Sequence, residues 1–150
     1  MPEDCMATIP LIEDAEATGK TREVFDDIKA TKGIDFVPNI WRSLAIDPDH
    51  LESCWRRVKT IMADGALDRR TKEIIAVAVS ITNGCEYCVN SHSAALQKQG
   101  LTRQGLAEVV AVTELFNAMN RVAVAYQIDA DVRPSVDGWP DADGAGDTPA

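Results

Sequence analysis

The sequence of 150 residues lacks the features that mark membrane proteins and nucleic-acid-binding proteins. No apolar run approaches the roughly 18 residues that would span a bilayer, and residues 1–5 carry acid where a secretory signal needs base. The only basic pairs are Arg56-Arg57 and Arg69-Arg70, in a chain with a formal net charge of −9. We interpret both pairs as solvated helix faces, because neutralising phosphates requires clustered Lys and Arg. A soluble, cytoplasmic protein with no membrane or nucleic-acid partner is expected.

Strand signals are also missing, which predicts an all-α fold of about six helices. Proline is absent between Pro48 and Pro134, and no stretch alternates with the period of two that is typical of a strand. Apolar residues recur instead at steps of three and four, as on one face of a helix. Segment 74–81 is apolar on all sides and could be a buried strand, but such a strand would have no partner. The helices are expected at residues 21–32, 38–46, 48–62, 69–82, 84–100 and 103–127, with Pro38 as a first helical residue and Asp47, Asp68 and Thr102 as N-caps.

Length and composition predict how the chain is organised. A chain of this length suits one compact domain, so residues 1–130 are expected to form a single helical domain. After Asp129 the sequence is rich in Asp, Gly and Pro and poor in apolar residues, which predicts an acidic, flexible tail at 131–150. The last helix carries a wider apolar surface than one core contact needs, and this favours a homo-oligomer.

The most informative motif is the pair Cys85 and Cys88, followed four residues later by His92. Two thiols at this spacing can close a disulfide with little backbone movement. At the start of a helix, the unpaired N–H groups and the positive dipole end favour thiolate over thiol. His92 would lie one turn after Cys88 on the same face, where an imidazole can exchange a proton with the sulfur. In a reducing compartment the pair is interpreted as redox-active or metal-binding, whereas Cys5 and Cys54 are interpreted as incidental or buried thiols.

Four segments of the sequence, residues 37–45, 68–73, 84–92 and 116–123, carry a larger pattern. They include Glu73, an acid twelve residues ahead of Cys85, together with the Cys-x2-Cys-x3-His run. With these segments the chain resembles the alkylhydroperoxidase D-like (AhpD-like) family of the carboxymuconolactone decarboxylase superfamily, and particularly its peroxidase-related branch. The resemblance extends over most of residues 10–127.

The resemblance implies an all-α fold and a thiol-dependent hydroperoxide reductase. By this resemblance, Cys88 would attack the peroxide, Cys85 would resolve the oxidised Cys88, and Glu73 and His92 would form a proton relay. Helix-dipole reasoning alone would choose Cys85 as the more acidic thiol, so the assignment rests on the His92 spacing and on the resemblance. The family's best-described peroxidases carry a second histidine between the cysteines. This chain has Tyr87 there, which either replaces that histidine as a hydrogen-bond donor or accompanies a weaker activity.

The sequence has no Gly-rich dinucleotide fingerprint, so reducing power has to come from elsewhere. The expected partners are therefore a peroxide substrate and an external dithiol, either dihydrolipoamide- or thioredoxin-like. No cofactor and no metal are expected. By resemblance, the homo-oligomer would be a trimer or a hexamer.

Other functions remain open at this point. Cys85, Cys88 and His92 could ligate zinc with help from His50-x3-Cys54, although three ligands from one continuous helix seldom form a closed tetrahedron. The chain could also be a helical oligomer whose cysteines sense redox state without turnover. A third alternative is decarboxylation of the kind carried out by the superfamily's lactone decarboxylases, which lack the cysteine pair, and the presence of that pair argues against it.

Overall fold

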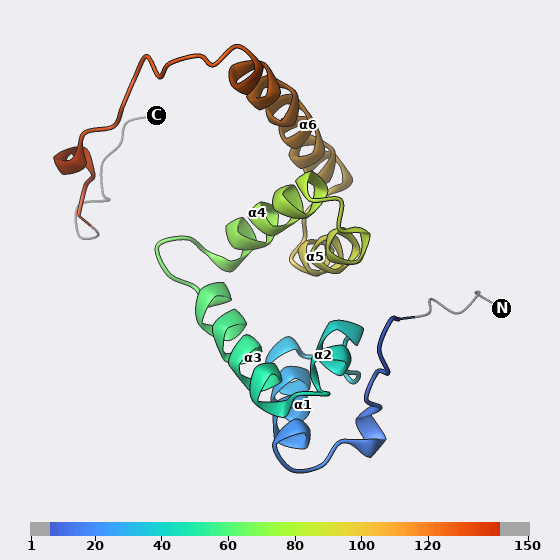
Figure 1. Cartoon of the computed structure of the whole chain (residues 1–150). Helices are drawn as coiled ribbons and strands as arrows, with labels where there is room; N and C mark the ends of the chain where they lie inside the picture. Colours follow the sequence, from blue (N-terminus) through green and yellow to red (C-terminus); the bar gives the residue numbers. More distant parts are fainter. Residues whose placement is uncertain (1–6, 142–150) are drawn as a thin grey trace. The chain divides into compact units, whose positions relative to one another are not determined.

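Every regular element within residues 7–141, the part of the chain that the computed structural model describes, is a helix (Figure 1). The elements in chain order are η1 (Asp14–Glu16), α1 (Gly19–Lys32), α2 (Asn39–Leu44), α3 (Pro48–Met62), α4 (Arg69–Thr82), α5 (Glu86–Lys98), α6 (Arg103–Ala125) and η2 (Val136–Gly138), of which η1 and η2 are short 3₁₀ helices. The prediction of an all-α fold with six α-helices is confirmed, and segment 74–81 belongs to α4. Among the described helices none is long and apolar enough to cross a bilayer.

Side chains in the sequence fix where three of these helices begin. Asp47 accepts the backbone N–H groups of two residues in the first turn of α3, each at 3.1 Å, with Pro48 as the first helical residue. Asp68 accepts the N–H of Thr71 at 2.7 Å at the start of α4, and this bond holds the pKa of Asp68 below its usual range. Thr102 caps α6 in the same way. All three predicted N-caps are confirmed.

The bounds of α1, α2, α5 and α6 differ from the predicted ranges by one or two residues. Pro38 is the N-cap of α2 rather than its first residue, because its ψ of 145° is extended. The helix that follows is shorter than the predicted 38–46. At the other end of the chain, α6 stops at Ala125, since Gln127 adopts a φ of 51° that a right-handed helix cannot continue.

The contacts divide the chain into two compact units, Met1–Ala63 and Asp64–Ala150. The single domain over residues 1–130 stays a prediction. Within the predicted tail the short helix η2 is the regular element of residues 131–141. Residues 142–150 and Cys5 lie outside the described part of the chain.

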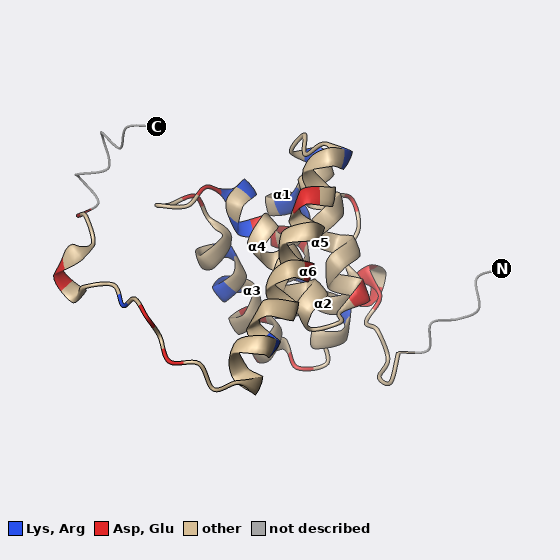
Figure 2. Cartoon of the chain, turned by 90° about the horizontal axis from the view of Figure 1, so that it is seen from above, with Lys and Arg blue, Asp and Glu red and all other residues tan. Residues whose placement is uncertain are grey.

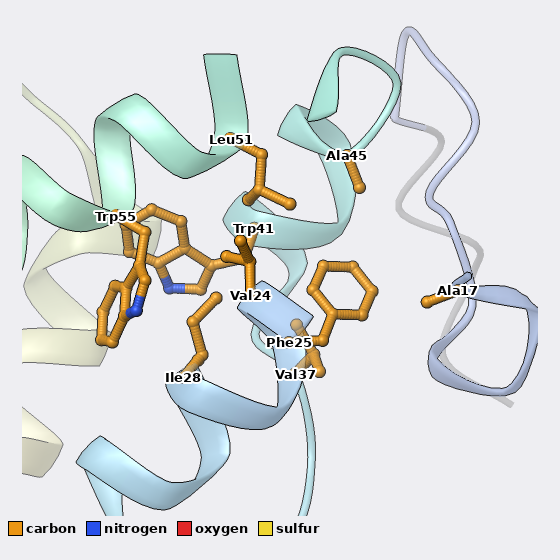
Figure 3. Close-up of a cluster of buried hydrophobic side chains, with 9 residues drawn as sticks. All are labelled: Ala17, Val24, Phe25, Ile28, Val37, Trp41, Ala45, Leu51 and Trp55. Carbon is orange, nitrogen blue, oxygen red and sulfur yellow. The ribbon is translucent and has the colours of Figure 1, made fainter. Parts of the chain in front are cut away.

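The first unit has a hydrophobic core formed where α1 and α2 each contact α3 (Figure 3). The core residues are Ala17, Val24, Phe25, Ile28, Val37, Trp41, Ala45, Leu51 and Trp55. Trp41 and Trp55 meet edge to face with ring centroids 5.1 Å apart, a geometry worth about 0.5–1.5 kcal/mol beyond area burial. Both tryptophans therefore belong to the core, and the half-buried thiol of Cys54 packs against it.

A polar contact joins α1 to α3 beside this core. The indole Nε1 of the buried Trp55 donates a hydrogen bond to Asp27 at 2.7 Å, and Lys59 donates to the same carboxylate oxygen. The hydrogen bond from Lys59 and then that from Trp55 hold the pKa of Asp27 below its usual range. The ionised carboxylate therefore stabilises the folded unit.

The second unit is organised around α4, which contacts both α5 and α6. Val77 of α4 and Leu96 of α5 are fully buried. Near the end of α4, Asn117 of α6 donates its side-chain N–H to the hydroxyl of Thr82 at 3.1 Å. Helix α4 therefore fixes α5, which carries the cysteine pair.

Replacing Asp27 by Ala should lower the free energy of unfolding by about 1–3 kcal/mol, because the buried Nε1 of Trp55 loses its acceptor. Asp27→Asn should lower it less at neutral pH. The contribution of the ionised Asp27 is present above the ordinary carboxyl pKa of about 3.9 and is lost as pH falls through the lowered pKa of the folded state. Urea unfolding between pH 2.5 and 7 should therefore show that the free energy of unfolding falls less with decreasing pH in Asp27→Asn than in wild type. The exposed Asp35→Asn serves as the control, and equal slopes for wild type and Asp27→Asn would contradict the assignment.

Candidate active site

A three-residue turn brings α5 back against α4. Asn83 ends α4 in a right-handed conformation, and Gly84 then adopts a φ of 68°, the left-handed region where glycine has no Cβ penalty. The N–H of Cys85 next donates to the carbonyl of Ser80 at 3.0 Å, which ties the start of α5 to the last turn of α4. The turn thereby places the cysteine pair beside α4.

The cysteine pair forms the N-terminus of α5. Cys85 is the N-cap, its sulfur accepts the N–H of Cys88 at 3.3 Å, and the helix begins at Glu86. The two sulfurs are joined in a disulfide, with the Cα atoms 5.3 Å apart. The pair is thus close enough to open and close a disulfide at a helix N-terminus, as the spacing predicted.

Glu73 and His92 meet across the contact between α4 and α5. Nδ1 of His92 lies 2.7 Å from Oε2 of Glu73, and the Glu73 side chain is only 5% exposed. A hydrogen bond to an ionised carboxylate requires the proton on Nδ1, so Nε2 is the ring nitrogen left to exchange protons with other groups. The burial of Glu73 distinguishes it from a solvent-exposed helix acid.

The sulfur of Cys88 and the ring of His92 lie on one side of α5. They are four residues apart in a regular helix, so their Cβ atoms are neighbours at about 5–6 Å. His92 is partly exposed, at 34% of its side chain, which leaves its ring open to solvent and to small molecules. The candidate active site, namely Glu73, Cys85, Cys88 and His92, therefore combines two thiols in disulfide form with a carboxylate–imidazole pair.

One residue of the site was missed from the sequence. Nε of Arg69 lies 3.9 Å from Oε1 of Glu73, four residues along α4. Arg69 had been interpreted as part of a solvated basic pair, and the i,i+4 spacing to Glu73 was the signal that could have identified it.

Tyr87 occupies the position between the two cysteines, in the first turn of α5. Its side chain is 43% exposed. The role of a hydrogen-bond donor that replaces a histidine stays a prediction for this residue.

The zinc alternative has no support in the geometry of this state. In residues 7–141 no group of three or more His, Cys, Asp and Glu side chains is arranged to hold a metal ion. Both sulfurs of the pair are bonded to each other, and each would have to be a thiolate to ligate zinc. His50 is exposed in the first turn of α3, in the other unit, as is expected of a solvated helix residue.

The structure is similar to a solved one. It matches the crystal structure of the alkylhydroperoxidase AhpD core from Rhodospirillum rubrum ATCC 11170 with a TM-score of 0.80 and 48% sequence identity. The match covers 84% of this chain and 95% of that one. The all-α arrangement described here is therefore the AhpD core fold.

Sequence comparisons find similarity to other proteins over somewhat less than half of this chain. The chain is 38% identical over 68 residues to uncharacterized protein 4 in cox locus of Paracoccus denitrificans, and 37% identical over 65 residues to the alkyl hydroperoxide reductase AhpD of Maricaulis maris (strain MCS10). These matches take in 45% and 43% of this chain but only 58% and 38% of the two relatives. Residues 48–131 match the carboxymuconolactone decarboxylase family, and this range includes the whole α4–α5 site. The chain belongs to the carboxymuconolactone decarboxylase family and is an AhpD-like member with a Cys-x-x-Cys pair.

Proposed function

We propose that the chain is a thiol-dependent reductase of hydroperoxides, with Cys88 as the attacking thiolate and Cys85 as the resolving thiol. One observation carries the proposal: in a disulfide-forming pair at a helix N-terminus, the second cysteine lies one turn from a histidine that is bound to a buried glutamate. The similarity to proteins named alkyl hydroperoxide reductase AhpD and to an AhpD core supports the reaction class. The cysteine pair favours this chemistry over lactone decarboxylation.

In the first step the Cys88 thiol passes its proton to His92, and the thiolate attacks the hydroxyl oxygen of the peroxide. The S–O bond forms as the O–O bond breaks, leaving sulfenic acid on Cys88 and an alkoxide. His92 gives a proton to the alkoxide, which leaves as an alcohol. The position of His92 one turn from Cys88 suits this transfer, directly or through a water molecule.

In the second step Cys85 resolves the sulfenic acid. The Cys85 thiol passes its proton to His92 through a water molecule, the thiolate attacks the sulfur of Cys88, and hydroxide leaves with a proton returned by His92 as water. The product is the Cys85–Cys88 disulfide, the form in which the pair is found. Over both steps two thiols and one hydroperoxide become a disulfide, an alcohol and water.

An external dithiol then restores the thiols. Its thiolate attacks the sulfur of Cys88, Cys85 departs as a thiolate, and the second thiol of the reductant resolves the mixed disulfide. The N–H of Cys88, which contacts the sulfur of Cys85, would stabilise that leaving thiolate. A dihydrolipoamide- or thioredoxin-like dithiol fits this requirement.

The proposal includes assembly through α6. Thr113 is buried, and Asn117 bonds to Thr82, so this side of α6 faces α4. At 100° per residue, Leu115 and Val122 lie on the opposite side. The large apolar residues of α6 that remain exposed are Val110, Val112, Leu115, Phe116, Met119, Val122 and Val124. Most of the helix is accordingly drawn as uncharged in Figure 2, and burial of this face against other copies of the chain would remove it from water.

Purified reduced protein supplied with dihydrolipoamide should consume hydrogen peroxide or an organic hydroperoxide over many turnovers. Cys88→Ser should abolish this turnover, because the attacking sulfur is gone. Cys85→Ser should consume about one equivalent and stop at a sulfenic acid that dimedone traps. Peroxide loss and intact mass measure both outcomes.

Cys54→Ser is the matched control, since this half-buried thiol packs against the core of the first unit, and it should turn over like wild type. Turnover by Cys88→Ser together with an inert Cys85→Ser would reverse the two roles. Wild-type protein that forms the disulfide without turnover would be a redox sensor instead, and reduced protein that retains stoichiometric zinc would be a metal-binding protein.

Glu73→Gln and His92→Gln should each lower turnover by about 10²- to 10⁴-fold, the usual range for loss of general acid–base catalysis. In a Cys85→Ser background, alkylation of Cys88 should also need a higher pH in both variants, because each substitution breaks the carboxylate–imidazole pair one turn from the sulfur. His50→Gln, which changes the other histidine of the chain, should leave both measurements unchanged. Identical alkylation profiles in all four proteins would show that neither Glu73 nor His92 tunes the cysteine.

Light scattering at micromolar concentration should find a homo-oligomer, a trimer or a hexamer by resemblance. Replacing both Leu115 and Val122 by Glu should reduce it to smaller species, because two buried charges in each copy would oppose the contact. Asn120→Glu adds a charge to an exposed polar position of the same helix and should leave the assembly intact. A monodisperse wild-type species of 16.3 kDa would refute assembly through α6.

A further inference from the structure

Arg69 brings an unused hydrogen-bond donor to the candidate active site. Its side chain is 43% exposed as a whole, yet its Nε is buried and has no hydrogen-bond acceptor. Buried donors are seldom left unpaired in folded proteins, so this N–H needs an acceptor nearby. A carboxylate oxygen, Oε1 of Glu73, lies 3.9 Å away.

The start of α4 restricts which acid Arg69 can serve. The backbone N–H of Arg69 donates to the side chain of Asp64 at 2.7 Å, and the backbone N–H of Thr71 donates to the side chain of Asp68. Both nearby aspartates are thus committed to backbone groups at the beginning of the helix. Within the described residues, Glu73 is the acid within ion-pair distance of the Arg69 guanidinium.

The two oxygens of Glu73 face different partners. Oε2 is bound to Nδ1 of His92 at 2.7 Å, while Oε1 faces Arg69. A carboxylate held at one oxygen can still turn about its last side-chain bond, whereas a carboxylate held at both cannot. The present separation exceeds a hydrogen bond by about 1 Å, a gap that a small side-chain shift or one bridging water closes.

We propose that Arg69 is a positioning residue that acts through Glu73. It holds Oε1 by charge and hydrogen bonding, and so keeps Oε2 directed at Nδ1 of His92 and keeps the ring turned toward the sulfur of Cys88. The guanidinium suits this role, because it carries its charge at every working pH and its N–H donors form a planar fork that matches the two acceptor oxygens of a carboxylate. The catalytic part of this inference rests on the proposed peroxide reduction, and the positional part does not.

The two histidines of the chain allow a direct test. Protein labelled with ¹⁵N at the imidazole nitrogens gives signals only from His50 and His92, and the exposed His50 in the other unit is an internal reference. In Arg69→Gln the Nδ1 signals of His92 should shift, and the hydrogen-bonded Nδ1 proton should exchange faster with water, while those of His50 stay in place. Arg70→Gln, the neighbouring exposed arginine, should change neither histidine.

Arg69→Lys should return the His92 signals part of the way to wild type, because a lysine restores the charge without the planar fork. In turnover assays, kcat of Arg69→Gln should fall by up to about 100-fold, the cost of a misplacement near 1 Å, with KM for the dithiol unchanged. Arg69→Lys should recover part of kcat. If Arg69→Gln does not fold, Arg69→Met, which keeps the aliphatic stem, replaces it in both measurements.

Identical His92 signals in wild type and Arg69→Gln, with unchanged circular dichroism, would overturn the proposal. So would shifts of the same size in Arg70→Gln. The spectra are read without any peroxide or reductant, so they decide the placement of Glu73 even if the wild-type chain shows no peroxidase turnover. Absence of that turnover would count against the proposed function alone.

Discussion

The hydrogen bond between Glu73 and His92 is the contact on which the arrangement of the second unit depends. Glu73 lies on α4 with its side chain 5% exposed, and a buried carboxylate without a partner would cost more than the folded state gains from burying it. Its partner comes from another helix, nineteen residues later in the chain. The helices must therefore meet face to face, and the left-handed Gly84 and the bond from Cys85 to Ser80 are the local means by which they do.

The same contact sets the environment of the two sulfurs. A helix is rigid over one turn, so holding His92 against Glu73 also fixes the direction of Cys88. Cys85 is seven residues from His92, so it is not the neighbour of that ring on the helix. Its sulfur instead accepts a hydrogen bond from the N–H of Cys88 at the helix N-terminus. The two sulfurs thus have different surroundings: Cys88 has an imidazole one turn away on the same helix face, and Cys85 has a backbone donor. Such a difference suits a pair in which one sulfur attacks and the other departs.

Local features of the fold could be predicted from the sequence, and contacts between distant residues could not. The periodic apolar residues and the caps at Asp47, Asp68 and Thr102 identified six helices, since both signals act within a few residues. The helix position predicted for Pro38 was wrong by one residue. The N-cap and the first helical position both accept proline, and only the backbone angle distinguishes them.

The candidate site shows the same limit. From its own segment Glu73 is indistinguishable from a surface acid, and the resemblance to a family supplied its pairing with His92. Arg69 has a neighbour of identical type, and although its i,i+4 spacing to Glu73 is a local signal, that spacing does not show that the carboxylate is buried. Only the return of α5 onto α4 buries Glu73, and that return makes the i,i+4 neighbour on α4 part of the site.

Helix α4 connects the candidate site to the proposed assembly. It presents Glu73 to α5 and, through Thr82, is bonded to Asn117 of α6. Helix α6 contacts α4 on the side that carries Thr113 and Asn117, and it leaves a second set of large apolar residues, among them Leu115 and Val122, exposed. An ordinary surface helix has a single apolar stripe that faces the core, so this second apolar face lacks a partner within the described chain. If other copies of the chain bury that outward face, α6 becomes a fixed support behind α4, and the position of Glu73 then depends on the assembly as well as on His92. Packed interiors transmit displacement because they contain little free space, so a change in oligomeric state would reach the carboxylate through a single intervening helix.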